Sequence, residues 1–220
     1  MMKEAGCRIS ALSLNIYILN LTSYIRWMPP FPRKLVLASR SPRRRELLTE
    51  AGYKFNVIPP AESVECGVCS RESPAELVAR LAYEKAADVA RRVGRGVVLG
   101  CDTVAECNGE ILGKPGDMAT DRRMLELLRG REHRVLSGLC LWDYPDAKPD
   151  TRVAVTRLRM DALTDWQLDE YLESYQWEGK AGAFGYQDRL GWIHIIEGSE
   201  SNVVGLPLEL LAQMMETVAG

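Results

Sequence analysis

The sequence has little histidine, no excess of positive charge and no long apolar run, and each shortage argues against a class of protein. The only histidines, His133 and His194, stand far apart, so Cys66-Gly-Val-Cys69 has no second pair of zinc ligands and is interpreted as a polar loop. The net charge of -2 and the pI of about 5.8 supply no basic field for a nucleic-acid backbone, so no nucleic-acid partner is expected. Any anion must be recognised locally, which favours a small anionic ligand.

The N-terminal stretch is apolar but too short and too interrupted to span a membrane. Its run ISALSLNIYILNLTSYI contains Asn and Ser and falls below the roughly 20 residues of a spanning helix. No small-residue cleavage site follows before Arg26, and the six scattered cysteines therefore indicate reduced thiols in a cytoplasmic protein without a membrane partner. We expect residues 1–33 to be a spurious or disordered extension, translation to start at Met28, and residues 34–220 to form the domain.

Strand and helix signals alternate from residue 34 onward, which predicts an α/β fold with a sheet of mixed direction. Ser73 and Pro74 start a helix over 73–93, and Asn108-Gly109 predicts the turn of a hairpin within 96–115. The stretch NVVGLPLELL, residues 202–211, is interpreted as a strand end that leads into a helix over 207–219. The other expected strands are 34–39, 54–60, 133–143, 151–163 and 191–199. The other expected helices are 42–51, one within 117–133 that ends near Gly130, and 164–175.

Three consecutive arginines open the helix expected over 42–51, where the helix dipole disfavours cations by about 0.3–1 kcal/mol each. A strand that runs into a helix N-terminus through small residues such as Ser39 offers free N–H groups to an anion. Arginines there can fork onto phosphate oxygens. Because consecutive helical residues diverge by about 100°, we expect Arg43 first and Arg44 second to face a ligand and Arg45 to face solvent. From this stretch alone, a solvated basic turn is the alternative.

Further polar positions interrupt regular elements and are candidates for chemistry. Asp102 and Thr103 follow a buried strand, where a carboxylate is typical of a metal ligand or general base, although it can also cap a turn. Lys114 and Lys85 are cations that fit either a phosphate contact or an ordinary surface. The small residues of GKAGAFGYQD, 179–188, permit close approach of a ligand, with an aromatic and an amide to hold a base, or else form a tight turn.

In this order, these stretches resemble the Maf proteins, also called septum formation proteins, a family of nucleoside triphosphate pyrophosphatases. The resemblance covers roughly residues 34–219 and rests on LASRSPRRRELL, RLAYEKA, GCDTV, ILGKP, KAGAFGYQ and NVVGLPL in combination. It implies an elongated mixed β-sheet flanked by helices, similar to the inosine triphosphate pyrophosphatases, with two lobes around a cleft and a homodimeric assembly. It also implies hydrolysis of a nucleoside triphosphate to the monophosphate and diphosphate with a divalent cation such as Mg²⁺ or Mn²⁺.

The resemblance assigns roles to individual residues. Asp102 matches the proton acceptor for the attacking water and is expected to hold the metal with Glu62, for which the loop length leaves Glu65 as an alternative. Residues expected to bind the phosphates are Ser39, Arg43, Arg44, Lys85 and Lys114, and residues tied to substrate choice are Arg43, Thr103 and Gln187. These roles agree with the reaction, because attack at the α-phosphorus of a tetra-anion requires cations around the phosphates and a carboxylate for the water.

The substrate class follows from KAGAFGYQ, which is more similar to the branch acting on dTTP and UTP, with its pattern KAGAYGIQ, than to the branch acting on 7-methyl-GTP. Phe184 and Tyr186 depart from that pattern near the expected base pocket and leave modified pyrimidine nucleotides open. The expected role is nucleotide-pool housekeeping. A 7-methyl-GTP pyrophosphatase and a non-catalytic nucleotide-binding regulator of cell division remain alternatives. An enzyme with Asp102 as covalent nucleophile would usually carry a second acid two residues later, where this chain has Val104.

Overall fold

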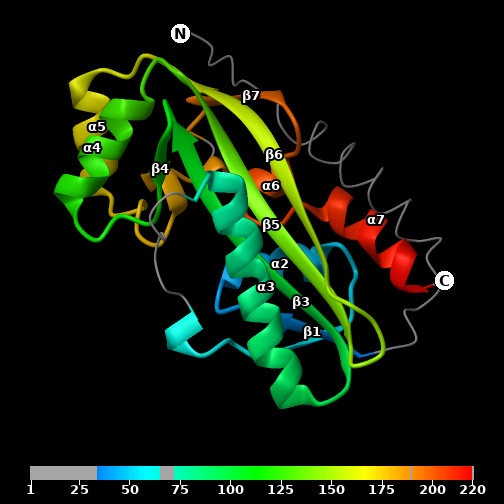
Figure 1. Ribbon diagram of the computed structural model, residues 1–220. Coiled ribbons are helices and arrows are strands. Elements are labelled where there is room, and N and C mark those ends of the chain that lie inside the picture. The colour runs from blue at the N-terminus through cyan, green and yellow to red at the C-terminus, as the bar shows by residue number, and fades with distance from the viewer. Residues whose placement is uncertain (1–33, 65–71, 189, 220) are drawn as a thin grey trace, which may run out of the picture.

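The computed structural model describes residues 34–64, 72–188 and 190–219, and a seven-stranded mixed sheet runs through them. The strand order is β2-β1-β3-β5-β6-β7, with β4 also paired to β3 (Figure 1). Strand β1 is parallel to β2 and β3, whereas the other pairs are antiparallel. The strands are β1 (Leu35–Ala38), β2 (Phe55–Val57), β3 (Gly96–Cys107), β4 (Glu110–Leu112), β5 (Glu132–Tyr144), β6 (Asp150–Met160) and β7 (Ile193–Glu197). The expected α/β fold with a mixed sheet is confirmed.

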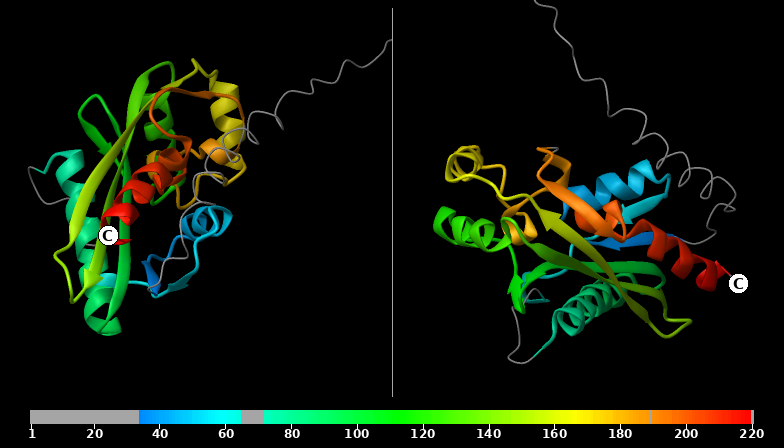
Figure 2. Two further views of the ribbon diagram at one scale, coloured as in Figure 1. Left: turned by 90° about the vertical axis from the view of Figure 1, so that its right-hand side faces the viewer. Right: turned by 90° about the horizontal axis from the view of Figure 1, so that it is seen from above.

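Helices lie on both faces of this sheet (Figure 2). The α-helices are α2 (Pro42–Glu50), α3 (Pro74–Val93), α4 (Met118–Leu128), α5 (Asp165–Glu173), α6 (Glu200–Val204) and α7 (Leu208–Ala219), and the 3-10 helices are η1 (Glu62–Val64), η2 (Ala181–Ala183) and η3 (Tyr186–Asp188). None of the described helices is long and apolar enough to cross a membrane. The extension expected over 1–33 lies outside the described residues, as do Glu65, Cys66 and Cys69.

Local sequence signals account for most element boundaries. Helix α3 begins with a capping box, in which the Ser73 side chain accepts from the backbone N–H of Glu76 and the Glu76 carboxylate accepts from that of Ser73. The β3–β4 hairpin turns at Asn108-Gly109, and both residues have positive φ, as a two-residue turn of this kind requires. These observations confirm the predicted helix and hairpin.

Two glycines bring α3 unusually close to the sheet. A Cβ atom added at Gly100 on β3 would lie 2.1 Å from the Ala82 carbonyl oxygen, and one at Gly138 on β5 would lie 2.1 Å from that of Val78. Only glycine permits such an approach of two backbones. Helix α3 therefore packs directly on the middle of β3 and β5. From this position its Lys85 reaches Asp102 on β3.

The opposite face of the sheet carries two separate hydrophobic clusters. One contains Leu48 of α2 and Leu211 of α7 together with residues of β1, β3 and β5, whereas the other contains Leu125 of α4 and Leu168 of α5 with residues toward the far ends of β3, β5 and β6. The helices in each cluster are amphipathic, with an apolar face toward the sheet and a polar face toward solvent. The fold therefore has two lobes on this face, in agreement with the architecture that the resemblance implies.

One predicted element is wrong. The residues after Glu200 were expected to end a strand, but they form the short helix α6 (Glu200–Val204). The Ser199 side chain caps this helix by accepting from the Asn202 backbone N–H, and Gly205 ends it with a φ of 121°. The two valines suggested a strand, while the cap and the terminating glycine decided the local structure. The correction matters because it brings the Gly205 carbonyl to the site described next.

Candidate active site

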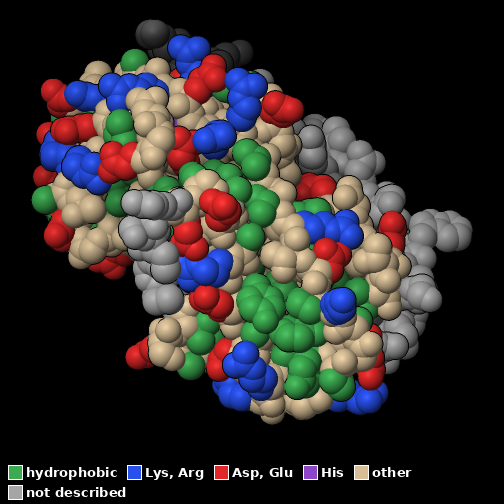
Figure 3. All heavy atoms as spheres, viewed as in Figure 1, with side chains coloured by type: hydrophobic (Ala, Val, Ile, Leu, Met, Phe, Trp, Pro, Cys, Tyr) green, Lys and Arg blue, Asp and Glu red, His purple; other side chains and the backbone are tan. Residues whose placement is uncertain are grey.

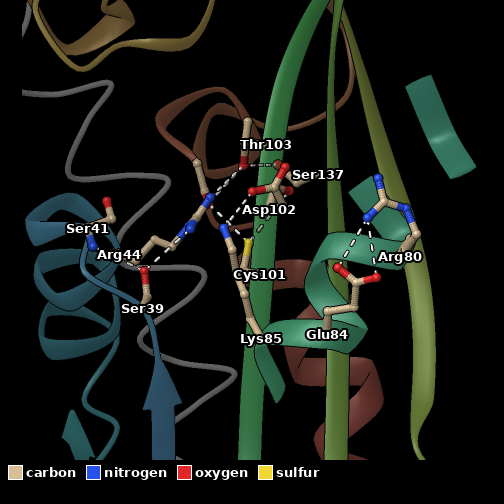
Figure 4. A network of polar contacts seen from close by, with 11 residues as sticks. Ser39, Ser41, Arg44, Arg80, Glu84, Lys85, Cys101, Asp102, Thr103 and Ser137 are labelled. Atoms are coloured by element: carbon tan, nitrogen blue, oxygen red, sulfur yellow. Dashed lines mark hydrogen bonds and ion pairs between the residues drawn. The ribbon is translucent and has the colours of Figure 1, made fainter. Parts of the chain in front are cut away.

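The candidate site lies where strand β3 loses its neighbour. Strand β1 pairs with β3 as far as Ala38 and Gly100, and β4 pairs with β3 only from Ala105 onward. Residues 101–104 therefore lack a strand partner on this edge within the described chain, and the N-terminus of α2 faces the gap (Figure 4). An opening beyond the carboxyl end of a parallel strand is a common place for ligands in α/β proteins.

Arg44 connects the elements that meet at this gap. Its Nε donates to the Gly205 carbonyl at 2.8 Å, its Nη2 to Thr103 Oγ1 at 3.1 Å and its Nη1 to Ser39 Oγ at 3.4 Å (Figure 4). Thr103 Oγ1 also lies 2.8 Å from Ser137 Oγ on β5. Among the described residues, the Arg44 guanidinium bonds neutral oxygens only, which leaves its positive charge available to a bound anion.

A charged pair stands beside these contacts. Lys85 Nζ donates to Asp102 Oδ1 at 2.7 Å, and the two side chains are only 7% and 15% exposed (Figure 4). The second carboxylate oxygen of Asp102 has no hydrogen-bond partner within the described chain. A largely buried carboxylate that is held by a cation on one oxygen can accept a proton from a water molecule on the other.

Cys101 lies between the guanidinium and the charged pair but takes no part as a nucleophile. Its thiol is fully buried and donates to the Gly205 carbonyl at 3.3 Å. Burial raises the pKa of the Cys101 thiol, which keeps it protonated, and thiolate rather than thiol is the reactive form. Cys107 and Cys140 are buried free thiols as well, in line with the expectation of reduced cysteines.

A cavity of about 430 Å³ opens beside Thr103. Its volume lies within the range of small-molecule sites. Cationic side chains line it near the N-terminus of α2, and apolar side chains line it further along β3, β5 and β6. The cations are Arg40, Arg43, Arg44, Lys114 and Lys180, and the apolar residues include Ala105, Leu128, Val135, Leu158 and Ile193. The cavity can therefore take a ligand that is anionic at one end and apolar at the other.

Arg43 ties the start of α2 to the loop after α5. Its Nη2 donates to the Gly179 carbonyl at 2.8 Å, so two segments far apart in sequence close over the cavity. Burial, reinforced by the neighbouring charge of Arg44, lowers the pKa of Arg43, which marks it as a guanidinium held in a cation-rich, partly desolvated place. Arg45 is exposed, which confirms the sequence prediction that it faces solvent.

The glycine-rich segment 179–188 folds around a buried ion pair. Lys180 Nζ lies 2.6 Å and 2.5 Å from the two carboxylate oxygens of Asp188, and Tyr171 donates to the same carboxylate at 3.0 Å. Gly182 has a φ of 70° and stands where a Cβ would lie 2.7 Å from the Ala105 side chain. Gln187 lies in η3 next to Asp188, and its side chain is outside what the structure describes.

Among the residues expected to act together, Glu62 lies apart. Its side chain on η1 is 93% exposed and comes within 4.0 Å of Arg40. No group of three or more His, Cys, Asp or Glu side chains that could hold a metal gathers in the described residues. The metal role of Glu62 therefore stays a prediction, while Ser39, Arg44, Lys85, Asp102 and Thr103 meet at the gap and Arg43 and Lys114 line the cavity.

Sequence reasoning missed several contributors. The carbonyl groups of Gly179 and Gly205 and the hydroxyl of Ser137 hold the arginines and Thr103, yet main-chain acceptors leave no mark in composition. Lys180 and His133 also line the cavity. Lys180 lay within the stretch that was singled out, whereas His133 stands alone in the sequence and carries no spacing signal.

The fold and the site define a class: an α/β protein with a cation-lined cavity next to a buried lysine–aspartate pair. The chain belongs to the family described as Maf-like protein, which matches residues 34–218. The dTTP/UTP pyrophosphatase of Rhodopirellula baltica is 56% identical over 188 residues, 85% of this chain and 83% of the relative. That of Geotalea uraniireducens is 43% identical over 175 residues, 79% and 89% of the two chains. The solved Ham1 protein of Staphylococcus aureus aligns over 84% of this chain and 99% of its own, with a TM-score of 0.48 and 17% identity.

Proposed function

We propose that this protein is a nucleoside triphosphate pyrophosphatase that hydrolyses dTTP or UTP to the monophosphate and diphosphate, as part of nucleotide-pool housekeeping. The observation that carries the proposal is the 56% identity to a dTTP/UTP pyrophosphatase over most of both chains. The cation-lined cavity beside Asp102 supports it, because a triphosphate needs several cations and its hydrolysis needs a water-activating group.

The triphosphate binds at the cationic end of the cavity. Arg43 and Arg44 at the start of α2, together with Lys114, present their positive charges to the phosphate oxygens, with Arg44 held in place by Thr103 and Gly205. The free N–H groups of the first helical turn favour an anion in the same place. The bound anion is attracted both by the arginines and by the positive end of the helix dipole, and these attractions offset the unfavourable placement of the arginines in the first turn.

Asp102 acts on the attacking water. Its free oxygen accepts a proton while the water oxygen forms a bond to the α-phosphorus; the bond from that phosphorus to the bridging oxygen breaks, and diphosphate leaves with its electron pair. Lys85 holds the carboxylate at 2.7 Å and fixes the direction of the free oxygen. Positioned general bases of this kind contribute roughly 10²–10⁴ in rate.

The residues fit a divalent cation that is shared with the substrate. Carboxylate oxygens are hard ligands, and Mg²⁺ is usually held by one or two carboxylates and the substrate phosphates, with water in the remaining positions. A carboxylate has about four lone-pair sites, so Asp102 could contact the cation with one and still accept the proton of the water with another. Glu62, or Glu65 of the adjoining segment, would supply a second carboxylate. When bound, Mg²⁺ or Mn²⁺ neutralises part of the charge on the phosphates.

The test is a product assay with Mg²⁺ or Mn²⁺ and dTTP, UTP, CTP, GTP and 7-methyl-GTP. We expect diphosphate and monophosphate in equal amounts from dTTP and UTP, with ¹⁸O from labelled water in the monophosphate. Incorporation into diphosphate, or release of single phosphate, would contradict the proposal. Turnover of 7-methyl-GTP alone would retain the chemistry and overturn the pyrimidine assignment, and binding without turnover would favour a regulatory protein.

Localisation, oligomeric state and translation start are proposed as well. We propose a cytoplasmic homodimer whose activity resides in residues 34–220, with translation from Met28. The molar mass from light scattering tests the dimer, and the N-terminal peptide of the native protein, identified by mass spectrometry, tests the start. A monomer, or a peptide that begins before Met28, would contradict these two points separately.

A further inference from the structure

A polar side chain, that of His133, stands among the apolar residues that line the cavity. His133 at the start of β5 lines the cavity together with Val135, Leu158 and Ile193. It pairs across the sheet with Leu158, and it shares its face of β5 with Val135, because side chains two residues apart point the same way. The cavity is therefore cationic at the end that faces α2, and His133 lies among apolar side chains at the other end.

The imidazole is buried and uncharged. His133 is 5% exposed, and burial lowers the pKa of its ring against the opposing influence of the Arg131 carbonyl and the Glu106 carboxylate. A neutral imidazole has one donor and one acceptor nitrogen. A single polar group in an apolar pocket is the usual means of fixing the orientation of a bound ring system.

The two ring nitrogens differ in their surroundings. Nδ1 is fully buried and makes no hydrogen bond of normal geometry within the described chain. Nε2 is not among the buried atoms without a partner, so it is the ring nitrogen on the side of the cavity, and the Arg131 backbone carbonyl, an acceptor on the protein side of the ring, favours the hydrogen on Nδ1. Nε2 is then the nitrogen left to face the cavity, with a lone pair rather than a hydrogen.

The geometry points to His133 as a specificity-determining residue of the pyrimidine site, with Nε2 accepting a hydrogen bond from N3–H of uracil or thymine. This inference rests on the proposed function and gives a reason why the site would prefer uracil and thymine to cytosine. Uracil and thymine carry a donor at N3, whereas cytosine carries an acceptor there. Two acceptors facing each other in an apolar pocket leave both without a partner, which disfavours the nucleotide that carries cytosine.

The experiment compares kcat/KM for UTP and CTP in the full-length protein and two variants. We expect the wild type to prefer UTP. His133→Phe keeps a ring but removes the acceptor, so it lowers kcat/KM for UTP about tenfold or more and leaves CTP within about threefold. His133→Gln has an amide that can accept or donate, so it keeps UTP within about threefold and raises CTP about tenfold. His194→Gln is the matched control, since His194 is exposed on β7 and bonds Asp161.

Both variants lower the ratio of kcat/KM for UTP to kcat/KM for CTP, His133→Phe by slowing UTP and His133→Gln by accelerating CTP. A general loss of packing would lower kcat/KM for both substrates. An unchanged ratio in both variants overturns the inference, and so does a wild type that uses CTP as well as UTP. If His133→Phe does not fold, the ratio for His133→Gln decides alone. A wild type that turns over UTP with unchanged ratios in the variants contradicts only this inference, whereas a wild type without diphosphate release from UTP or dTTP contradicts the proposed function and the inference with it.

Discussion

Arg43 and Arg44 at the cavity differ from many arginines elsewhere in the chain in what their guanidinium groups contact. Arg43 donates to the Gly179 carbonyl, and Arg44 to the Gly205 carbonyl and to the hydroxyls of Thr103 and Ser39. All of these acceptors are neutral. No ion pair to either guanidinium is found in the described residues, so two adjacent cations stand together at the unfavourable end of a helix.

Away from the cavity, arginines pair with carboxylates. Arg80 contacts Glu72 at 2.5 Å and Glu84 at 3.1 Å, and Arg134 contacts the buried Glu106 at 2.6 Å. Acidic and basic side chains also lie next to one another over the end of the molecule that carries α4 and α5 (Figure 3). The comparison shows that these structural arginines have carboxylate partners, whereas Arg43 and Arg44 have neutral partners in the described residues and can pair with an anionic ligand.

The largest effect is expected at the Lys85–Asp102 pair beside the cavity. Asp102→Asn removes the proton acceptor and retains the shape of the side chain, so kcat should fall by roughly 10³ while KM changes little. Steady-state kinetics with UTP measure this, with a melting curve to show that the variant is folded. A decrease of less than tenfold in a folded variant would exclude Asp102 as the base.

Removal of a cavity arginine should weaken transition-state binding rather than the fold. Arg44→Ala is expected to lower kcat/KM for UTP by roughly 10², the loss typical of one charge-stabilising donor at a reaction centre. The matched control is Arg157→Ala, which removes exposed pairs to Glu132 and Glu197. We expect activity within about twofold of the wild type for the control, and equal losses in both variants would contradict the distinction drawn between the two kinds of arginine.

A polyphosphate that lacks a nucleobase should stabilise the folded protein through the cavity arginines and not through arginines elsewhere. Tripolyphosphate at about 100 times its Kd should stabilise the wild type by about 2.7 kcal/mol, which raises Tm by several degrees. Arg44→Ala should lose most of this shift, while Arg157→Ala should keep it. Differential scanning fluorimetry across a concentration series measures the effect, and equal shifts in all three proteins would place polyphosphate binding elsewhere.

The smallest expected effect is on folding stability, and it comes from a buried carboxyl group that has no close cation. Asp121 on α4 is fully buried, its carboxylate oxygens have no hydrogen-bond partner within the described chain, and burial raises its pKa to about 7 against the attraction of Lys180. Because the folded state binds the proton more tightly than the unfolded state, folding stability falls as pH rises from about 4 through 7.

The stability of Asp121→Asn should therefore exceed that of the wild type by more at pH 8 than at pH 5. Urea titrations at the two pH values measure the free energy of unfolding in each protein. A difference that is the same at both pH values would contradict the raised pKa, and a less stable variant at pH 8 would show that the carboxylate has an ionic partner.

Sequence signals were sufficient for elements whose ends have local chemistry. The capping box at Ser73, the Asn108-Gly109 turn and the Pro42 start of α2 all lie where they were expected. The approximate position of the site was predicted from short motifs that occur in the same order in the family that the chain resembles. What could not be predicted depends on contacts between distant segments, such as the bond from Arg43 to Gly179. The helix at 200–204 was missed because a capping serine and a final glycine outweighed the strand preference of two valines.

The most direct test of the account is a crystal structure with a UTP analogue whose α,β-bridging oxygen is replaced by a methylene group, so that the bond to be cleaved stays intact. We expect the triphosphate against Arg43, Arg44 and Lys114, the α-phosphorus beside Asp102 and the uracil in the apolar end next to His133. A triphosphate that lies away from these arginines, or a uracil bound at the cationic end, would contradict the assignment of the cavity.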